Sequence, residues 1–374
     1  MYTPAVARFT LCFALVAACL LRLSPAHARE IPLTFSTQLP VSVAMAERVR
    51  FWVDVFTRVS HTEVVLHDRD DPTLVYDVVR YGPGGDSSQI DATRASYQRL
   101  LGEMAIEGGL TQAMPAGLYQ ALTPVSLERL RMRALFGERA NPIAYVRALG
   151  NIRAQRGMKE PFIDGLVRAE LYLPGIRRIF REARLPPELV YLPHVESSFN
   201  PSAVSRAGAA GLWQFTRLTF EHYDKTAGAD ARFDPVRSTE VAAQHLQRAR
   251  EVLGNWPLAV VSYNHGVAGM VRARTAVGVD SLDDIVRGYD GASFGFASQN
   301  FYAEVLAAAH VASHARTYFP DMRQPPTMQY VVKPGDSLWT IARRHRVSVR
   351  DLTAANNLGG SRLKTGQLIV IKTS

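Results

Sequence analysis

Apolar side chains recur at helical spacing through most of the chain between residues 156 and 317. Leu166, Ala169 and Leu173 form one such series, and residues 241–253 carry another. Spacings of three and four residues place side chains on one face of a helix. The pattern therefore predicts a mainly α fold, with an all-helical domain over residues 156–317.

The start of one helix in this domain is predicted at Ser238. A serine oxygen can accept a hydrogen bond from an unpaired amide of the first turn, and Glu240 would place negative charge near the positive end of the helix dipole.

The stretch from 29 to 155 has a different pattern, in which short apolar runs alternate with turn-rich segments. Residues 64–66 and 74–79 are rich in β-branched side chains and predict a short β-hairpin, and the remainder is rich in helix formers. No chemical motif stands out here. We expect a mostly helical supporting region.

The C-terminal part begins after a proline-rich linker, residues 318–328, which carries three prolines and little periodicity. Two runs of strand composition, 330–332 and 368–371, flank two short helical patterns centred on Leu338 and Leu352. Residues 329–374 are therefore predicted to form a small β-α-α-β domain.

The N-terminal 28 residues have the pattern of a signal peptide. Arg8 precedes an apolar run from Phe9 to Leu21, and Ala26-His27-Ala28 has the form of a cleavage site. The run is too short for a membrane-spanning helix of about 20 residues. We therefore expect an exported protein of the periplasm or cell envelope.

Lipidation is the alternative to simple cleavage of this segment. Val16-Ala17-Ala18-Cys19 resembles a lipobox, which would give a lipid anchor at Cys19 and attachment to the outer membrane. Leu20 and Leu21 continue the apolar run, whereas lipoproteins usually turn polar directly after the cysteine. The only other cysteine, Cys12, lies in the same segment, so a chain cut after Ala28 would have no disulfide.

Net charge and composition restrict the class of partner. The formal charge of +9 and pI of 9.7 indicate an acidic or anionic partner. The basic residues are spread rather than striped, and export argues against nucleic acid. There is no His-Glu-x-x-His motif and no phosphate-binding glycine-rich loop, so we expect neither a metal nor a cofactor. A monomer is expected.

Glu196 is the leading candidate for chemistry. In the predicted helix that starts near Pro187, Leu189, Leu192 and Pro193 fall on the same face as Glu196. A carboxyl group on an apolar face has a raised pKa, which is what a general acid needs at neutral pH. A structural glutamate paired with Arg206 fits the same position equally well.

The residues around Glu196 resemble the signature of the soluble-lytic-transglycosylase family. Residues 196–201 match its Glu-Ser-x-Phe-Asn-Pro motif, and residues 205–215 match its next block. Tyr263-Asn264 resembles a third motif and Tyr302 the last. The resemblance, closest to the membrane-bound type D branch, implies a goose-lysozyme-like helical fold with Glu196 as the catalytic residue. The substrate-binding residues that it implies are Ser205, Gln214, Phe215, Tyr263, Asn264 and Tyr302.

Four residues in two motifs depart from the family pattern. Thr216-Arg217 stands where Met-Pro is usual, and Ser262 and His265 stand where alanine and serine are usual. These departures bear on the sugar subsites and leave the acid in place.

The resemblance implies a substrate and a mechanism. The expected substrate is the glycan strand of peptidoglycan, cleaved without water at the β-1,4 bond after N-acetylmuramic acid to leave a 1,6-anhydro end. A single carboxylate in the motif is consistent with this reaction, because hydrolysing glycosidases ordinarily use two. A hydrolytic muramidase and an inactive peptidoglycan-binding protein are the alternatives.

The C-terminal domain closely resembles a LysM domain over its whole length, from Tyr330 to Leu368. The family binds N-acetylglucosamine units between the loop after the first strand and the loop before the second. The glycan-binding residues that this implies are Gly335, Asp336, Ser337, Leu338, Asn356, Asn357 and Leu358.

Overall fold

The structure is a computed structural model that describes residues 31–110, 124–225, 230–322, 327–356, 358 and 363–372. The predicted signal segment, with Cys12 and Cys19, lies outside these residues. Among the described helices, none has the length and apolar character that crossing a membrane requires.

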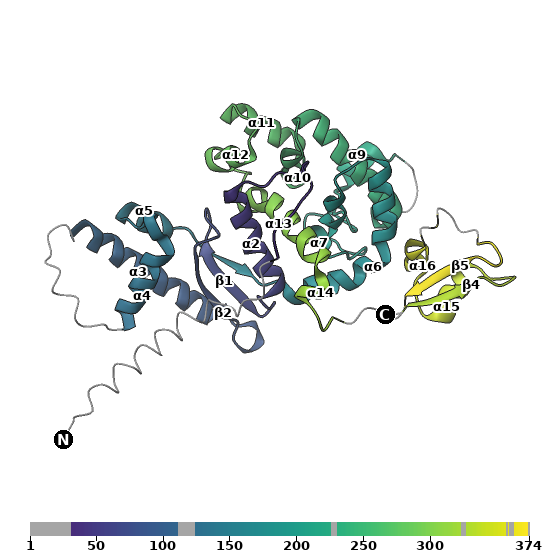
Figure 1. Ribbon diagram of the computed structural model, residues 1–374, viewed down its shortest axis with the longest axis horizontal. Helices are drawn as coiled ribbons and strands as arrows, with labels where there is room; N and C mark the ends of the chain where they lie inside the picture. The colour runs from purple at the N-terminus through teal and green to yellow at the C-terminus, as the bar shows by residue number, and fades with distance from the viewer. Residues whose placement is uncertain are drawn as a thin grey trace, which may run out of the picture. The chain divides into compact units, whose positions relative to one another are not determined.

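A buried helix, α13 (Phe296–Ser313), forms the centre of the helical part. It packs against α2 (Val43–Thr57), α7 (Leu192–Ser197) and α10 (Trp256–His265), as Figure 1 shows. Small side chains such as Ala307, which is fully buried, let these neighbours approach closely. The predicted mainly helical fold is confirmed. The packing of α2 on α13 also joins residues before 155 to the helices that follow.

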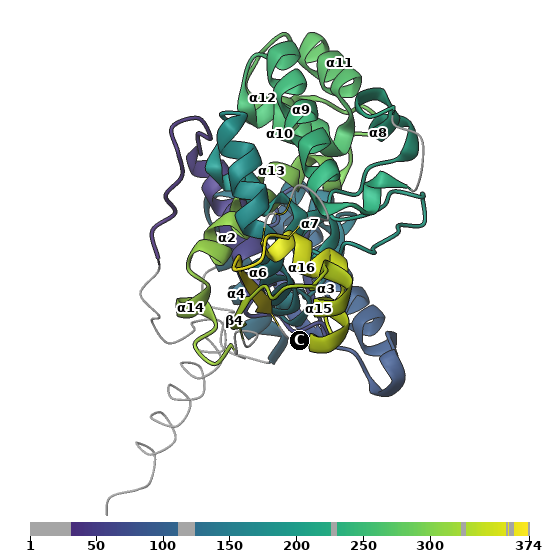
Figure 2. The same ribbon diagram turned by 90° about the vertical axis from the view of Figure 1, so that its right-hand side faces the viewer.

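The other helices of this part surround the central one. In Figure 2, α9 to α12 lie together, in agreement with their mutual contacts. These helices are α6 (Lys159–Glu182), α8 (Arg217–Tyr223), α9 (Pro235–Leu253), α11 (Val267–Val277), α12 (Leu282–Gly288) and α14 (Ala315–Tyr318).

The start of α9 differs from the prediction. The helix begins at Pro235, and the N-cap is Asp234, whose carboxylate accepts hydrogen bonds from the Val236 and Arg237 amides at 2.8 and 3.0 Å. Ser238 lies inside the helix, where its hydroxyl donates to the Asp234 carbonyl. Placing the N-cap at Ser238 was wrong, because Asp-Pro provides both an acceptor for the free amides and a first residue that needs no amide of its own.

A three-stranded antiparallel sheet follows α2. Its strands are β1 (Glu63–Asp68), β2 (Val75–Arg80) and β3 (Ile152–Arg156), in the order β2-β1-β3. Val65 pairs with Val78 on one side and with Gln155 on the other. The predicted hairpin is confirmed. Strand β3 has no strand signal in its sequence, because it is polar and short, and only pairing with β1 makes it a strand.

One face of this sheet is covered by α3 (Ser88–Leu110), α4 (Pro124–Phe136) and α5 (Pro142–Leu149). Their shared core includes Tyr76 and Met132, both fully buried. This second core gives the N-terminal region its own hydrophobic support.

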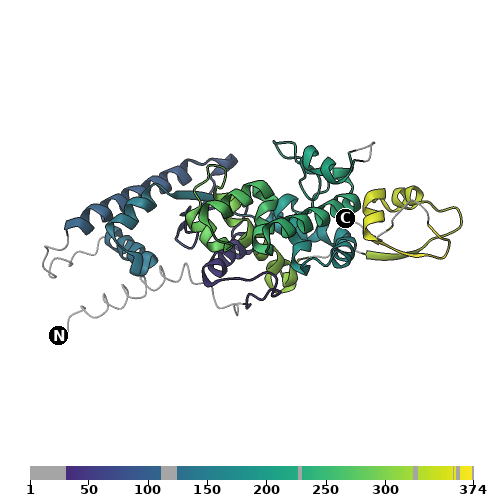
Figure 3. The ribbon, with the colours of Figure 1, turned by 90° about the horizontal axis from the view of Figure 1, so that it is seen from above.

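The C-terminal part has the predicted β-α-α-β order and a core of its own. It consists of β4 (Thr327–Val331), α15 (Leu338–His345), α16 (Val349–Ala355) and β5 (Leu368–Lys372), drawn in yellow in Figure 3. The two strands pair antiparallel over a core that includes Ile341.

The N-cap of α9 can be tested by mutation. We expect Asp234→Ala to lower the free energy of unfolding by about 1 kcal/mol, because two first-turn amides lose their acceptor. Ser238→Ala is the control and should cost less, since it removes a donor from a carbonyl that the Ser238 amide still satisfies. Urea denaturation measures both; a greater loss in Ser238→Ala would contradict this assignment.

Candidate active site

Glu196 lies near the end of α7, which follows a 3-10 helix over Pro187–Tyr191. The single long helix that the spacing predicts is interrupted there, because Pro193 has no amide to continue the hydrogen-bond ladder. Leu189 and Leu192 are fully buried, as predicted. Glu196 is partly buried at the edge of the same apolar side.

The turn after Glu196 is strained and firmly held. Ser198 and Phe199 have φ values of +49° and +56°, a region that costs non-glycine residues free energy. The Arg168 guanidinium donates to the Ser198 carbonyl at 2.9 Å, and the Ser197 hydroxyl donates to the Leu212 carbonyl at 2.8 Å. These bonds fix the end of α7, and with it the direction of the Glu196 side chain.

A buried histidine packs beneath this turn. The ring of His194 stacks on Phe162 at 4.5 Å and meets Phe199 edge-on at 4.6 Å. Burial lowers the pKa of His194 to about 3, so the ring is neutral at physiological pH. Gly165 makes room for it, since a Cβ there would lie 2.9 Å from Nδ1. His194 therefore supplies no positive charge to Glu196.

The carboxyl group of Glu196 has no charged partner in the described part of the chain. No hydrogen bond or ion pair joins it to Arg206, the partner that a structural glutamate would have, and Arg206 is exposed. Burial raises the pKa of Glu196 to about 8. The group is therefore mostly protonated at neutral pH and can donate its proton.

A second acidic residue, Glu304 on α13, faces the same space. Burial and the nearby charge of Glu196 raise the pKa of Glu304 to about 8, while Arg153 on β3 opposes the rise. The guanidinium of Arg153 lies 4.1 Å from the ring centroid of Phe296. Glu304 lies in the last motif, but the resemblance implied no role for it. Its position two residues after Tyr302, within the predicted helical domain, was the available signal.

The loop of residues 205–215 forms another side of the candidate active site. The amide nitrogen of the Gln214 side chain donates to the carbonyls of Ala203 and Gly211 at 3.2 and 2.9 Å, and Gln214 has φ +49°. The neighbouring indole of Trp213 is fully buried against Phe180. The loop is thus anchored by Trp213 and held in shape by Gln214.

Tyr263 joins this loop to α10. Its hydroxyl donates to the Trp213 carbonyl at 2.7 Å, and its ring stacks on Phe301 at 6.4 Å and packs against the buried Phe215 at 5.6 Å. Burial and the nearby charge of Glu196 raise its pKa well above the ordinary value. The next residue, Asn264, is exposed, and its carbonyl oxygen accepts a bond from the Ser298 hydroxyl at 2.8 Å.

Two of the predicted site residues are turned elsewhere. Tyr302 is 1% exposed, and its hydroxyl donates to the Pro40 carbonyl at 3.1 Å. Ser205 is exposed, and its hydroxyl accepts a bond from the Ala209 amide at 3.0 Å. Phe301, which the sequence analysis did not single out, provides the aromatic ring next to Tyr263.

The departures from the family pattern have local explanations. Thr216 is the N-cap of α8, where its hydroxyl accepts a bond from the Thr219 amide, and Arg217 pairs with Asp230 at 3.2 Å. His265 packs against Phe294 at 5.0 Å beside Asn264. Thr-Arg therefore starts a helix by capping, as Met-Pro would by its proline.

The residues predicted for glycan binding in the C-terminal part have structural roles of their own. Asp336 accepts bonds from the Tyr330 hydroxyl and the Lys333 amide at 2.6 and 2.9 Å. Ser337 caps α15, and the Asn356 side chain bonds both backbone groups of Val370. The exposed Gly335 has φ +82°, Leu338 is buried and Leu358 is half-buried. Asn357 lies outside the described residues.

In the part of the chain that the structure describes, no group of three or more His, Cys, Asp or Glu side chains is arranged to hold a metal ion.

Comparisons with known proteins relate two segments to families. Residues 178–281 match the transglycosylase SLT domain, and residues 330–372 match the LysM domain. The chain is 27% identical over 292 residues to the membrane-bound lytic murein transglycosylase D of Escherichia coli (strain K12), covering 56% of this chain and 65% of that protein.

A second relative is the membrane-bound lytic murein transglycosylase C of Actinobacillus pleuropneumoniae serotype 5b (strain L20), 27% identical over 169 residues, or 41% of this chain and 44% of that protein. The chain thus spans less than two thirds of the length of both relatives. The 70 kDa soluble lytic transglycosylase from Escherichia coli superposes with a TM-score of 0.34 at 14% identity, over 63% of this chain and 44% of that chain.

The loop of residues 205–215 passes very close to the backbone at Arg232, and this contact can be tested by mutation. Gly211 has φ +80°, and a Cβ there would lie 1.9 Å from the Arg232 carbonyl oxygen. We expect Gly211→Ala to lower the free energy of unfolding by roughly 3 kcal/mol, from left-handed backbone strain and a backbone clash. Gly208→Ala is the matched control, because φ is +79° and nothing lies within 4 Å. It should cost only about 1–2 kcal/mol. Equal losses in urea denaturation would rule out the clash.

Proposed function

We propose that this chain, which combines a transglycosylase SLT domain with a C-terminal LysM domain, cleaves the glycan strands of bacterial peptidoglycan as a lytic transglycosylase. The observation that carries the proposal is a partly exposed carboxyl group, Glu196, whose burial without a cation raises its pKa to about 8. A protonated carboxyl at the edge of a strained, rigid loop suits general acid catalysis.

In the proposed reaction Glu196 acts twice. Its proton goes to the oxygen that bridges N-acetylmuramic acid and N-acetylglucosamine, and the bond from C1 of the muramic acid to that oxygen breaks. The 6-hydroxyl oxygen of the same sugar then bonds to C1, and its proton returns to the Glu196 carboxylate. The products are a free 4-hydroxyl and a 1,6-anhydromuramyl end, and no water is consumed.

The positions of the neighbouring side chains support a division of roles. Gln214, Tyr263 and Asn264 would line the sugar subsites, where precise placement lowers the activation barrier. Ser205 would shape the entrance loop. Phe215, buried against Tyr263, would support the subsites from behind, whereas Tyr302 would act only through the packing of α13.

Glu304 supports a second candidate function. A hydrolysing muramidase needs a second carboxyl group to activate water or to stabilise the sugar cation, and Glu304 lies close enough to sense the charge of Glu196. In the transglycosylase, the same residue would line the site without taking part in the proton transfer. The two functions differ in whether water enters the product.

The proposal also covers glycan binding by the LysM domain and the cellular location of the protein. We propose that the LysM domain holds glycan strands through the loops around Gly335 and Asn356, and that residues 156–317, supported by α2, form the catalytic unit. The basic chain would act in the periplasm or cell envelope after export, where its charge favours the anionic wall.

The product identifies the reaction. Purified sacculi digested by the wild type should release muropeptides lighter by one water than hydrolysis products, by mass spectrometry. Glu196→Gln should lower the rate at least about 10²-fold, because the amide cannot donate and recover the proton. Its melting temperature should not fall, since an amide avoids the cost of an unpaired buried carboxyl group. Reducing ends would instead establish hydrolysis, and undiminished release by Glu196→Gln would refute its role.

The pH dependence identifies the acid. Glu196 must be protonated to act, and burial raises its pKa, so kcat/KM should hold through neutral pH and fall as the pH rises through about 8. Glu304→Gln, assayed on the same soluble glycan, should keep this descending limb and yield the same anhydro product. Disappearance of the limb in Glu304→Gln would assign the titration to Glu304 and favour the two-carboxylate reaction.

A further inference from the structure

A pocket of about 510 Å³ lies on a different side of α13 from Glu196. Its walls come from the segment before α2, the start of α2, the end of α9 and the beginnings of α10 and α12, together with Tyr302 on α13. Side chains two positions apart on a helix point about 200° apart around its axis. Tyr302 therefore faces this pocket, whereas Glu304 faces Glu196.

The walls of the pocket are fixed by hydrogen bonds. The Tyr302 hydroxyl donates to the Pro40 carbonyl, and the amide and hydroxyl of Ser36 donate to the Glu188 carboxylate at 2.6 and 3.1 Å. Leu39 between them is 1% exposed. A pocket whose walls are already ordered loses little conformational entropy when a ligand binds.

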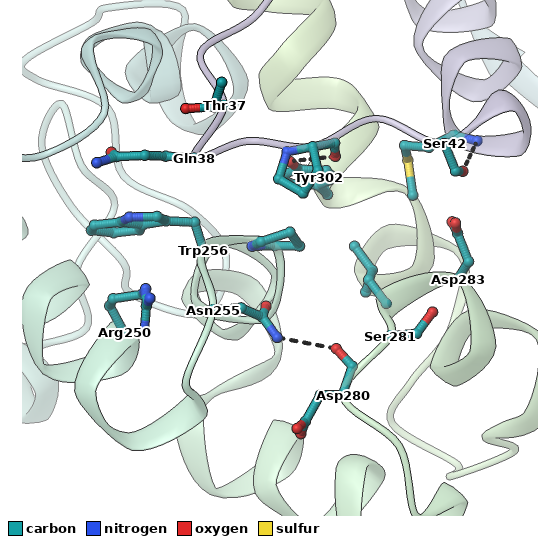
Figure 4. Close-up of a pocket in the computed structure, with 14 residues that line it drawn as sticks. Thr37, Gln38, Ser42, Arg250, Asn255, Trp256, Asp280, Ser281, Asp283 and Tyr302 are labelled. Carbon is teal, nitrogen blue, oxygen red and sulfur yellow. Dashed lines mark hydrogen bonds between the residues drawn. The ribbon is translucent and has the colours of Figure 1, made fainter.

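The lining combines an aromatic surface with polar groups that have no partner of their own. Figure 4 shows the indole of Trp256 between Gln38 and Arg250, with Asp283 across the pocket. Trp256 is half-buried and next to Pro257. In the described part of the chain, neither the Arg250 guanidinium nor the Asp283 carboxylate makes a hydrogen bond or an ion pair.

This chemistry fits a sugar ring. One face of a pyranose presents C–H groups, which pack on an indole, while its edge presents neighbouring hydroxyls that a carboxylate or guanidinium can bond in pairs. The pocket volume falls within the range of about 300–1,000 Å³ usual for small-ligand sites. The lining carries Arg250, Asp280 and Asp283, and Asp280 pairs with Arg274 at 3.8 Å, so little net charge remains, which favours an uncharged polyol over a polyanion.

We propose that this pocket is a second glycan-binding site, which holds a sugar unit of the wall on a different side of the catalytic domain from the cleavage site. The choice of N-acetylglucosamine as that sugar rests on the proposed function. Bound there, a strand would keep the enzyme on insoluble wall without occupying the cleft at Glu196.

The site can be observed in the full chain through its tryptophan. The chain has four tryptophans, so 5-fluorotryptophan labelling gives a small set of fluorine NMR signals, assigned by single Trp→Phe variants. Glu196→Gln serves as the parent, to exclude turnover. Titration with the N-acetylglucosamine tetramer should shift the Trp256 signal saturably. Trp339, exposed in the LysM domain, reports separately on that domain.

Matched variants connect the signal to the pocket. Asp283→Asn and Arg250→Gln should each weaken the Trp256 response about tenfold or more, because a charged hydrogen-bond partner is lost, and should leave the Trp339 response unchanged. Glu251→Gln is the control, since Glu251 follows Arg250 directly but pairs with Arg248 outside the pocket lining. With Glu196 restored, the two pocket variants should keep the wild-type rate on short soluble glycans and lose rate on sacculi.

Two results would overturn the proposal. One is a Trp256 signal that stays fixed while Trp339 responds to the tetramer. The other is a Trp256 signal that responds to a peptidoglycan stem peptide and not to the tetramer, which would make the pocket a peptide site. Neither result depends on which products are released from sacculi. The second binding site can therefore be disproved while the proposed reaction is still tested separately by its products.

Discussion

The structure around the candidate active site depends on one constraint, a carboxyl group that is surrounded by protein and has no cation beside it. Such a group favours its neutral form, because ionisation would leave a charge poorly solvated. His194, two residues before Glu196, is buried and neutral, and Arg168 bonds a backbone carbonyl rather than Glu196. The arrangement gives up stability that a salt bridge or an apolar side chain would provide, and this is common at sites that hold an acid for reaction.

The rigid loops around Glu196 follow from the same constraint. An acid that must meet one bridging oxygen needs a fixed direction, and three residues near it, Ser198, Phe199 and Gln214, have left-handed backbone conformations. Strain of this kind persists only where surrounding contacts outweigh it. Here those contacts are the buried indole of Trp213 and the hydrogen bonds of Ser197 and Tyr263.

The central helix α13 relates the two sides of this domain. Through Glu304 it faces the candidate acid, and through Tyr302 it supports the pocket beside Trp256. The N-terminal segment and α2 pack on this same helix, so residues before the sheet complete the helical core rather than stand apart from it. The last motif contains the second carboxyl group, Glu304, but its closeness to Glu196 follows only from the packing of α13. In the proposed reaction, whether water takes part would depend on how these two groups and the sugar are placed, which is a property of the assembled site.

The sequence by itself determined the helical class, the hairpin and the β-α-α-β order, and it made Glu196 the leading candidate for chemistry, because each depends on local spacing or on a contiguous motif. Only the tertiary structure decided that Arg206 leaves Glu196 unpaired, that Glu304 faces it and that Tyr302 turns toward Pro40. It also made a strand of the polar segment at 152–156 and moved the cap of α9 to Asp234. The physical reason is that burial, pairing and charge proximity join residues far apart in the chain, and the spacing of apolar residues along the sequence carries no record of those contacts.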